Sequence, residues 1–277
     1  MRGVTAASEV PFELEVAAVT DVGTEREHNE DRCGFLLENE SCGLLVVADG
    51  VSSAEAGETA SQTAVAATLR TFGEQPAGMS TAKRLYRAVQ QANIEIYDLA
   101  TVVPELRGMT TTLTAVVVDR GELTAAHIGD SRLYLVRGGR IVQLTKDHTV
   151  AAERARIGLL SKSRARTHKD RSVLTRSLGR ELIVPIDRFS NRLFRGDALL
   201  VCSDGLYNAL DDEELARLLE GGDAATTCRR LIDTANQRGT LDNLTAAVLR
   251  VRRGPEPPAA SAGLGARLRG LFGRRGG

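Results

Sequence analysis

The sequence has no tryptophan, only seven prolines and four cysteines among 277 residues, and no long uninterrupted apolar run. A membrane-spanning helix needs roughly 18 consecutive apolar residues, and the N-terminus lacks the basic, apolar and small-residue blocks of an export signal. We therefore expect a cytoplasmic protein. The cysteines form no CxxC pair, which favours reduced packing residues over a disulfide or a zinc site.

Charge is balanced overall, with 36 Lys and Arg against 36 Asp and Glu, but it is unevenly distributed. Residues 252–277 hold six arginines and one glutamate, a charge of +5, which leaves −5 for residues 1–251. A mildly acidic body disfavours nucleic acid as a partner. The Pro-, Ala-, Gly- and Arg-rich segment 254–277 is predicted to be a disordered tail. Weak contact with a membrane or partner protein, through its basic amphipathic stretch, is the alternative.

Nine apolar segments bounded by Gly, Asp and Asn are typical of β-strands. Two junctions between them, Arg120-Gly121 and Gly138-Gly139, have the residues of tight hairpin turns, which indicates antiparallel pairing. The predicted strands are 13–20, 33–37, 43–48, 111–119, 123–128, 132–136, 140–144, 198–202 and 244–251.

Helical periodicity appears in four segments, 54–72, 80–101, 211–219 and 224–238, and Ser80 is a suitable N-cap for the second. The strands cluster before and after helical pairs instead of alternating with single helices. This order predicts an α+β fold of stacked antiparallel sheets and disfavours a doubly wound parallel sheet. Because no repeat or linker interrupts the chain before residue 254, residues 1–253 are predicted to form one domain.

Acidic residues mark the ends of several predicted strands. Asp49, Asp130 and Asp204 each follow an apolar strand, and Asp242 comes just before one. A single Asp-Gly pair is ordinary turn chemistry. Four such carboxylates at one edge of two packed sheets would repel one another strongly unless cations neutralised them. The pattern therefore predicts a metal site.

The candidate ligands are all hard oxygen donors, which selects Mg²⁺, Mn²⁺ or Ca²⁺ and argues against zinc. Near the N-terminus, Arg26 precedes the adjacent acids Glu30 and Asp31. A solvated loop would carry such charges equally well. An arginine beside a two-metal carboxylate cluster would suit phosphate chemistry, because a guanidinium binds phosphate oxygens in pairs while metals polarise the others. Together these elements indicate phosphoryl hydrolysis.

In this order, the residues resemble the motifs of the type 2C metal-dependent protein phosphatases (PPM family), in their bacterial form. The resemblance covers residues 15–251, and the ordered set is far more specific than any single motif. The matching elements are Arg26, Asn29-Glu30-Asp31, Val47-Ala48-Asp49-Gly50, Gly57-Glu58, Gly108-Met109 with Thr111, Gly129-Asp130-Ser131-Arg132, Asp147-His148, Ser203-Asp204-Gly205 and Asp242-Asn243.

The resemblance implies a four-layer αββα sandwich, in which two packed antiparallel β-sheets are flanked by helical pairs. It also implies a centre of two Mn²⁺ or Mg²⁺ ions at one end, with a weaker third site in bacterial members. By this resemblance, Asp49 bridges both ions, Asp204 and Asp242 complete the first site, and the Gly50 carbonyl and Glu30 serve the second. Asp130 contributes to the third site. The resemblance also implies that Asp31 orients metal-bound water and that Arg26 holds the substrate phosphate.

The implied activity is hydrolysis of phosphoserine and phosphothreonine in proteins by a metal-bridging hydroxide, without a phosphoenzyme. The implied partners are phosphorylated proteins, among them a bacterial Ser/Thr kinase and its substrates, and a monomer is expected. Two alternatives stay open: a catalytically silent phosphoprotein-binding module on the same fold, and a phosphatase dedicated to an anti-sigma antagonist. The intact ligand set argues against the first.

The sequence departs from the family pattern at two places. Residues 51–53 are Val-Ser-Ser, where many bacterial relatives have Met-Gly-Gly and some eukaryotic ones carry a histidine proposed as general acid. No side chain is therefore assigned as the general acid, and neither His28 nor His148 is nominated. Thr110 stands where glycine is usual, which alters a turn but removes no ligand.

Residues 150–176 correspond to the flap that lies beside the active site in the family. Within it, residues 150–171 hold seven Lys or Arg against two acids. Two interpretations stay open for this segment. It is either a solvated charged helix and loop, or a basic surface that attracts phosphorylated peptides and is weakened by salt.

Overall fold

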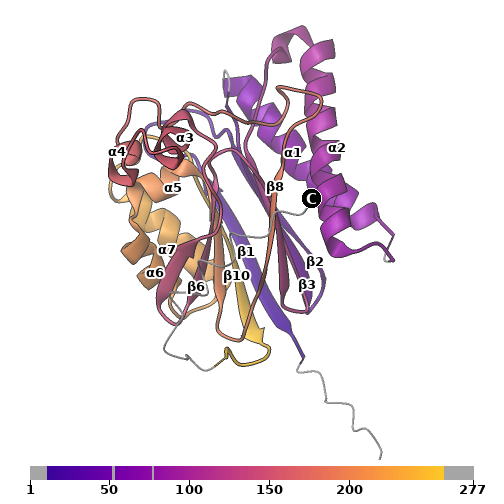
Figure 1. The fold of residues 1–277 in the computed structure, drawn as a ribbon, viewed down its shortest axis with the longest axis vertical. Coiled ribbons are helices and arrows are strands. Elements are labelled where there is room, and N and C mark those ends of the chain that lie inside the picture. The colour runs from indigo at the N-terminus through magenta and orange to yellow at the C-terminus, as the bar shows by residue number, and fades with distance from the viewer. Residues whose placement is uncertain (1–10, 52–53, 77, 259–277) are drawn as a thin grey trace, which may run out of the picture.

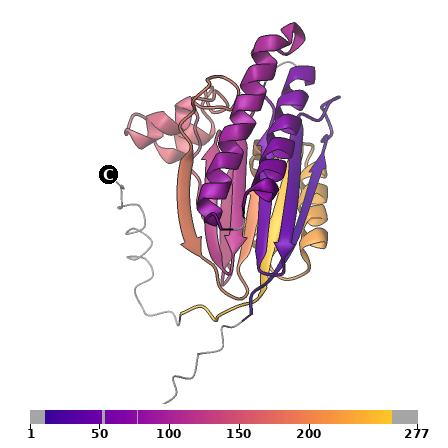
Figure 2. The same cartoon turned by 90° about the vertical axis from the view of Figure 1, so that its right-hand side faces the viewer.

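The computed structural model describes residues 11–258 apart from 52, 53 and 77, and its strands form two five-stranded antiparallel sheets that pack face to face (Figures 1 and 2). The first sheet has the order β1 (Glu13–Asp21), β10 (Leu244–Arg253), β9 (Ala198–Cys202), β6 (Arg132–Arg137) and β7 (Arg140–Gln143). The second has the order β2 (Asp31–Asn39), β3 (Cys42–Asp49), β4 (Leu113–Asp119), β5 (Glu122–Ile128) and β8 (Asp187–Arg192).

Helices cover the outer faces of both sheets (Figure 1). The long helices α1 (Ala54–Glu74) and α2 (Thr81–Val102) pack on the second sheet. The first sheet is covered by α5 (Asp204–Ala209), α6 (Asp212–Leu219) and α7 (Ala224–Asn236). The predicted αββα sandwich is therefore confirmed. Among the described helices, none combines the length and apolarity needed to cross a membrane.

Alternation along each central strand divides its side chains between two cores. In β3, Leu44 and Val46 pack against the helices α1 and α2, whereas Leu45 and Val47 pack between the two sheets. Successive side chains of a strand point to opposite faces. Because both faces of these strands are covered, the strands read in sequence as continuous apolar runs instead of alternating ones.

All nine predicted strands are present, with ends that differ by one or two residues in most cases. The two predicted hairpin turns are also confirmed. Arg120 and Gly121 have φ angles of +46° and +80°, and Gly138 and Gly139 have +55° and +72°. Positive φ at both central residues is the geometry that matches the twist of a two-residue hairpin.

The sequence did not predict β8, whose residues DRFSNR contain one apolar side chain, Phe189. It lies at the edge of its sheet, paired only with β5, so it needs little apolar surface. The short helices α3 (Val150–Arg156), α4 (Lys162–Arg166) and α5, and the 3-10 turn η1 (Pro104–Leu106), were also not delimited. Ser80 does precede α2, but its carbonyl, and not its hydroxyl, accepts the first helical hydrogen bonds.

The chain leaves the sandwich after β10. The carbonyl of Pro255 accepts a hydrogen bond from the Arg195 N–H at 3.0 Å, and Glu256 pairs with the Arg195 side chain at 3.0 Å. These contacts attach the first residues of the predicted tail to the domain. The amphipathic stretch within 259–277 lies outside the described residues, so its disorder stays a prediction.

Replacing Leu45 by alanine tests the core between the sheets. Leu45 is fully buried there, and a Leu→Ala change at such a site removes about 2–5 kcal/mol from the free energy of unfolding. We expect that loss in urea unfolding followed by circular dichroism. Leu182→Ala is the control, because that side chain is 52% exposed and its loss should change stability by less than about 0.5 kcal/mol. Equal effects of the two changes would contradict this assignment of the core.

Candidate metal centre

Antiparallel pairing places two acidic segments side by side at one end of the second sheet. Asp31 is the first residue of β2, and its register partner is Asp49, the last residue of β3. Beyond this pair, the Gly50 N–H donates to the carbonyl of Glu30 at 3.1 Å. The ladder therefore brings together residues that stand about twenty positions apart in the sequence.

Asp204 and Asp242 come together in the same way at the end of the first sheet. Asp204 begins α5 two residues after the end of β9, and Asp242 lies two residues before the start of β10, the neighbour of β9. Gly205 fits closely against this junction. A Cβ atom on Gly205 would lie 2.1 Å from the carbonyl oxygen of Asn243 and 3.3 Å from Cβ of Asp242. Only glycine allows this approach.

Buried hydrogen bonds join the ends of the two sheets. The Asp31 carboxylate, only 1% exposed, accepts hydrogen bonds from Ser203 Oγ at 2.6 Å and from Thr245 Oγ1 at 2.8 Å. The Asn243 Oδ1 accepts from the N–H of Glu30 at 2.9 Å. These bonds hold the N-terminal acidic segment against the ends of β9 and β10.

A fifth carboxylate, Asp130, is held at the same end by a chain of hydroxyl groups. Ser131 Oγ and Thr112 Oγ1 are hydrogen-bonded at 2.8 Å, and Thr112 Oγ1 also accepts from the Asp49 N–H at 3.0 Å. The preceding Gly129 has a φ of +104°, and a Cβ there would lie 2.5 Å from Cβ of Thr112. The loop that carries Asp130 therefore lies close to Asp49.

The carboxylate cluster, Asp31, Asp49, Asp130, Asp204 and Asp242, concentrates negative charge in a poorly solvated space. Burial raises the pKa of Asp49 well above its ordinary value, and the four other carboxylates raise it further. Burial is also the main cause that raises the pKa of Asp31 to about 7 and that of Asp204 to about 6. Such shifts mean that the ionised forms lack sufficient positive charge nearby.

Nearby arginines, including Arg132, supply part of that charge. Arg26 forms an ion pair with Asp242 at 3.0 Å, and its Nε donates to the Leu241 carbonyl at 3.2 Å. Arg171, near the end of the flap, lowers the pKa of Asp204 electrostatically, and Arg26 acts in the same direction. Sequence reasoning selected Arg26 but missed Arg171, whose only signal was its place in the basic flap.

Glu30 lies at the edge of the cluster. Burial raises its pKa, and the positive charge of Arg26 partly offsets that rise. Its side chain packs against Gly57 at the start of α1, where an added Cβ would lie 1.9 Å from Oε2 of Glu30. The predicted Gly57 motif therefore leaves space for the Glu30 carboxylate.

The donor chemistry of these residues fits a hard divalent ion, since every candidate ligand is an oxygen and the mutual repulsion calls for a cation. Within residues 11–258, leaving out 52, 53 and 77, however, no three His, Cys, Asp or Glu side chains are positioned to hold one ion together. Asp242 instead contacts Arg26, and Asp31 contacts two hydroxyl groups. The cluster is thus assembled at one end of the sandwich, but its carboxylates do not converge on a common point.

The two histidines considered as proton donors lie in different surroundings, and neither is assigned that role. His148 is buried, its Nδ1 accepts from the Gly129 N–H at 3.1 Å, and its Nε2 faces Asp187 at 3.2 Å. His28 is exposed on the N-terminal loop, where its carbonyl accepts from the side chain of Asn243. The general acid therefore has no assigned side chain.

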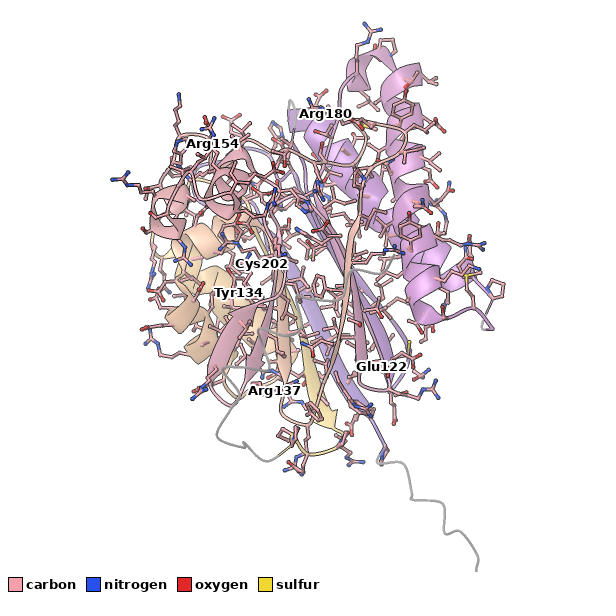
Figure 3. The ribbon with its side chains drawn as sticks, in the orientation of Figure 1. Glu122, Tyr134, Arg137, Arg154, Arg180 and Cys202 are labelled. Carbon is pink, nitrogen blue, oxygen red and sulfur yellow. The ribbon has the colours of Figure 1, made fainter. Side chains whose placement is uncertain are left out.

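The flap lies at the same end of the molecule as the carboxylate cluster. Figure 3 labels Arg154 in the flap and Arg180 just beyond it at the upper end, whereas Glu122 and Arg137 lie toward the opposite end. Part of the positive charge of the flap is neutralised within the flap, because Arg154 pairs with Asp170 at 2.7 Å.

Thr110, which stands where the family usually has glycine, also lies beside the cluster, since its hydroxyl donates to the carbonyl of Val51 at 2.8 Å.

Comparison with known proteins agrees with this arrangement. The family model described as protein phosphatase 2C matches residues 23–248. The chain is 36% identical over 239 residues to the serine/threonine phosphatase stp of Listeria monocytogenes, with 84% of this chain and 94% of that protein covered.

Solved structures give the same result. The serine/threonine phosphatase PstP/Ppp of Mycobacterium tuberculosis superimposes with a TM-score of 0.78 and 34% identity, over 88% of this chain and 100% of that one. The catalytic domain of PstP in complex with two manganese ions gives a TM-score of 0.77 at 34% identity, over 87% and 99% of the two chains. The chain therefore belongs to the protein phosphatase 2C family and is a serine/threonine protein phosphatase.

Proposed function

We propose that the carboxylate cluster is the catalytic centre of a two-metal phosphatase that uses Mn²⁺ or Mg²⁺. In this proposal Asp49 would serve both metal sites, Asp204 and Asp242 would complete one of them, and Glu30 and the Gly50 carbonyl would serve the other. Asp130 contributes to a weaker third site. The observation that carries the proposal is the gathering of these oxygen donors at one end of the two sheets, where Asp31 pairs with Asp49 in the ladder. Burial and, after it, the other carboxylates raise the pKa of Asp49, and cations among them would remove the repulsion. The manganese ions of the related PstP structure support the same ligand chemistry.

Bound ions would supply Lewis acidity, which lowers the pKa of water and offsets the charge of a phosphate group. Asp31 is suited to orient the attacking water and accept its proton, because its pKa is raised to about 7 and two hydroxyl groups fix its carboxylate. Arg26 is 47% exposed and borders the cluster, so it would bind the oxygens of the substrate phosphate. We propose direct in-line attack on phosphorus, without a covalent intermediate on the chain.

The substrates we propose are phosphorylated proteins, including a Ser/Thr kinase and the proteins it modifies. The names of the related phosphatases and the basic flap support this class of substrate. Comparing the phosphoproteins of a deletion strain with those of its parent tests the proposal. Phosphoserine and phosphothreonine sites should gain occupancy in the deletion strain, and an unchanged set would contradict this role.

Asp204→Asn tests the metal proposal with two readouts. Removing one carboxylate charge should weaken Mn²⁺ binding in isothermal titration calorimetry and lower kcat/KM for p-nitrophenyl phosphate by at least about 100-fold, since even residues that only support ligands cost 10–100-fold. The matched control is Asp212→Asn on α6, an exposed carboxylate that pairs with Arg166. Unchanged Mn²⁺ binding by Asp204→Asn would refute the ligand assignment.

Arg26→Ala tests phosphate binding. A charge-assisted hydrogen bond is worth about 1.5–3 kcal/mol, so we expect KM for a phosphothreonine peptide to rise about 10- to 100-fold. Arg26→Lys should restore part of the loss, because lysine keeps the charge but not the paired geometry. Arg229→Ala on α7, an exposed arginine, is the control. A fall in kcat with KM unchanged would argue for a different role of Arg26.

The pH dependence of stability gives a test that does not need activity. Burial raises the pKa of Asp31 to about 7 and of Asp204 to about 6, from an ordinary value of 3.8. The folded state therefore binds more protons than the unfolded state between these values, and the metal-free protein should lose stability as pH rises from about 4 to about 7.

Metal ions should reverse this loss, because they bind the deprotonated carboxylates. We compare the melting temperature in Mn²⁺ with that in EDTA at pH 5 and at pH 7.5. The increase caused by Mn²⁺ should be larger at pH 7.5 than at pH 5 by at least ~4 °C, which corresponds to about 1–2 kcal/mol in a domain of this size. Differential scanning calorimetry measures both values, and contributions common to the two conditions cancel. A difference that does not grow with pH would count against metal binding at the cluster.

A further inference from the structure

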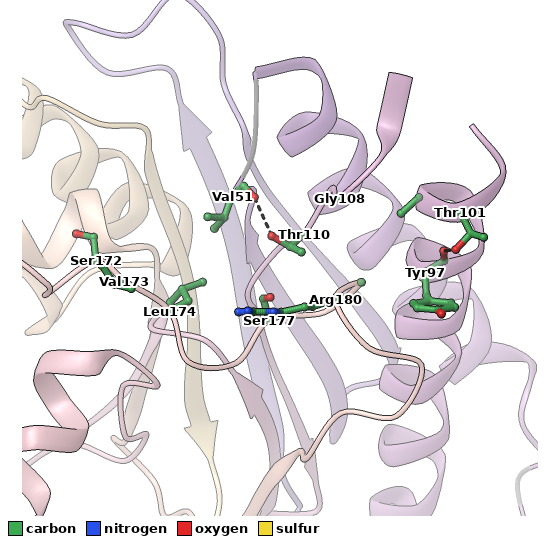
Figure 4. Close-up of a pocket in the computed structure, with 12 residues that line it drawn as sticks. Val51, Tyr97, Thr101, Gly108, Thr110, Ser172, Val173, Leu174, Ser177 and Arg180 are labelled. Atoms are coloured by element: carbon green, nitrogen blue, oxygen red, sulfur yellow. Dashed lines mark hydrogen bonds between the residues drawn. The ribbon is translucent and has the colours of Figure 1, made fainter. Parts of the chain in front are cut away.

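A pocket of about 640 Å³ opens next to the carboxylate cluster (Figure 4). Its walls come from four parts of the chain: the residue after Gly50, the C-terminal part of α2, the segment 108–110, and the segment 172–180 at and just beyond the end of the flap. Val51 and Thr110 lie on one side, and Tyr97 lies on α2. The proposed catalytic roles use none of these side chains.

Backbone pairing connects the pocket directly to the cluster. Gly50 forms a bridge with Thr111, and Thr111 forms a second bridge with Leu178. Neighbouring strands lie about 4.8 Å apart, so the backbone of Leu178 lies about 10 Å from that of Gly50. An extended peptide spans about 3.3 Å per residue. A substrate whose phosphoresidue sits at the cluster would therefore reach this pocket within about three residues.

A buried asparagine fixes the turn at the far side of the pocket. Asn93 of α2 is 2% exposed, and its Oδ1 accepts from the Gly179 N–H at 2.9 Å. Its Nδ2 donates to the carbonyls of Glu181 at 2.9 Å and Leu182 at 3.0 Å. Arg180 lies between these anchored residues, so its backbone is held in place while its side chain stays exposed.

Among the residues that the structure describes, no carboxylate forms an ion pair with Arg180. By contrast, Arg154 and Arg176, at the same end of the molecule, pair with Asp170 and Asp187. Figure 4 shows its side chain extending into the pocket near Ser177. A cation on an anchored turn that faces a peptide-sized pocket is complementary to an acidic side chain.

We propose that this pocket binds the substrate segment beside the phosphorylated residue, and that Arg180 selects an aspartate or glutamate in that segment. This inference rests on the proposed catalytic role of the cluster. The position selected lies two to four residues from the phosphoresidue, as the backbone spacing indicates. The exposed side chains of Val51 (40%) and Val173 (49%) border the same pocket and would contact the apolar parts of the segment.

Matched phosphothreonine peptides test the selection. In an otherwise alanine background, one series carries Glu and the other Lys at the second, third or fourth position on either side of the phosphothreonine. For the wild-type protein with Mn²⁺, kcat/KM should be about fivefold higher for the Glu peptide at one of these positions, through a lower KM, as expected for a partly exposed ion pair. The preference should shrink in 0.5 M NaCl.

The Arg180→Glu variant should invert this ratio, whereas Arg229→Glu, an equal charge change on the far helix α7, should leave it as in the wild type. Because each variant is judged by a ratio between two peptides, a uniform change in activity does not affect the result. The selection by Arg180 would be overturned if the wild type showed no preference between the Glu and Lys peptides, or if the Arg180→Glu variant kept the wild-type preference. In either case, hydrolysis of the peptides would leave the catalytic proposal intact. A wild type that hydrolyses neither the peptides nor p-nitrophenyl phosphate would overturn both.

Discussion

Repulsion among the carboxylates at one end of the sandwich is the main electrostatic cost that this fold must offset. Asp49 is surrounded by four other acidic side chains, and each raises its pKa. Such a cluster destabilises its own fold at neutral pH unless cations accompany it. Arg26, which contacts Asp242, and Arg171, which acts on Asp204, offset part of this repulsion. Because the arginines offset the repulsion only in part, we propose divalent ions as a further source of positive charge.

The two apolar cores make this unfavourable arrangement possible. A shift of one residue between β2 and β3 would move Leu45 and Val47 out of the core between the sheets and bring Leu44 and Val46 into it. The register is therefore strongly fixed, and with it the pairing of Asp31 and Asp49. Stability gained along the whole length of the strands holds together charges that would separate if their segments were free.

The sequence allowed the strand ends and the acidic residues there to be predicted, because an apolar run that stops at an aspartate is a local pattern. The family resemblance then grouped these residues into one site. Contacts between residues far apart in the sequence left no local pattern that could predict them. Arg26 pairs with Asp242, more than 200 residues away, and Arg171 of the flap lowers the pKa of Asp204. The edge strand β8 was missed for a related reason, since pairing with β5 supports it more than its own composition does.

The two sides of the proposed active centre are built differently, and this difference separates chemistry from selectivity. Backbone ladders fix the carboxylate side, where a substitution that disturbs the register would disturb both cores. The substrate side has only isolated backbone bridges, such as that between Thr111 and Leu178, and depends more on single side chains. Asn93 anchors the turn that carries Arg180, and His148 binds the backbone of Gly129 beside the flap. Exposed residues on such turns can change without cost to the sheets. If the pocket binds the substrate segment as proposed, exchanges among the residues that border it would change the peptide preference without changing the hydrolytic centre.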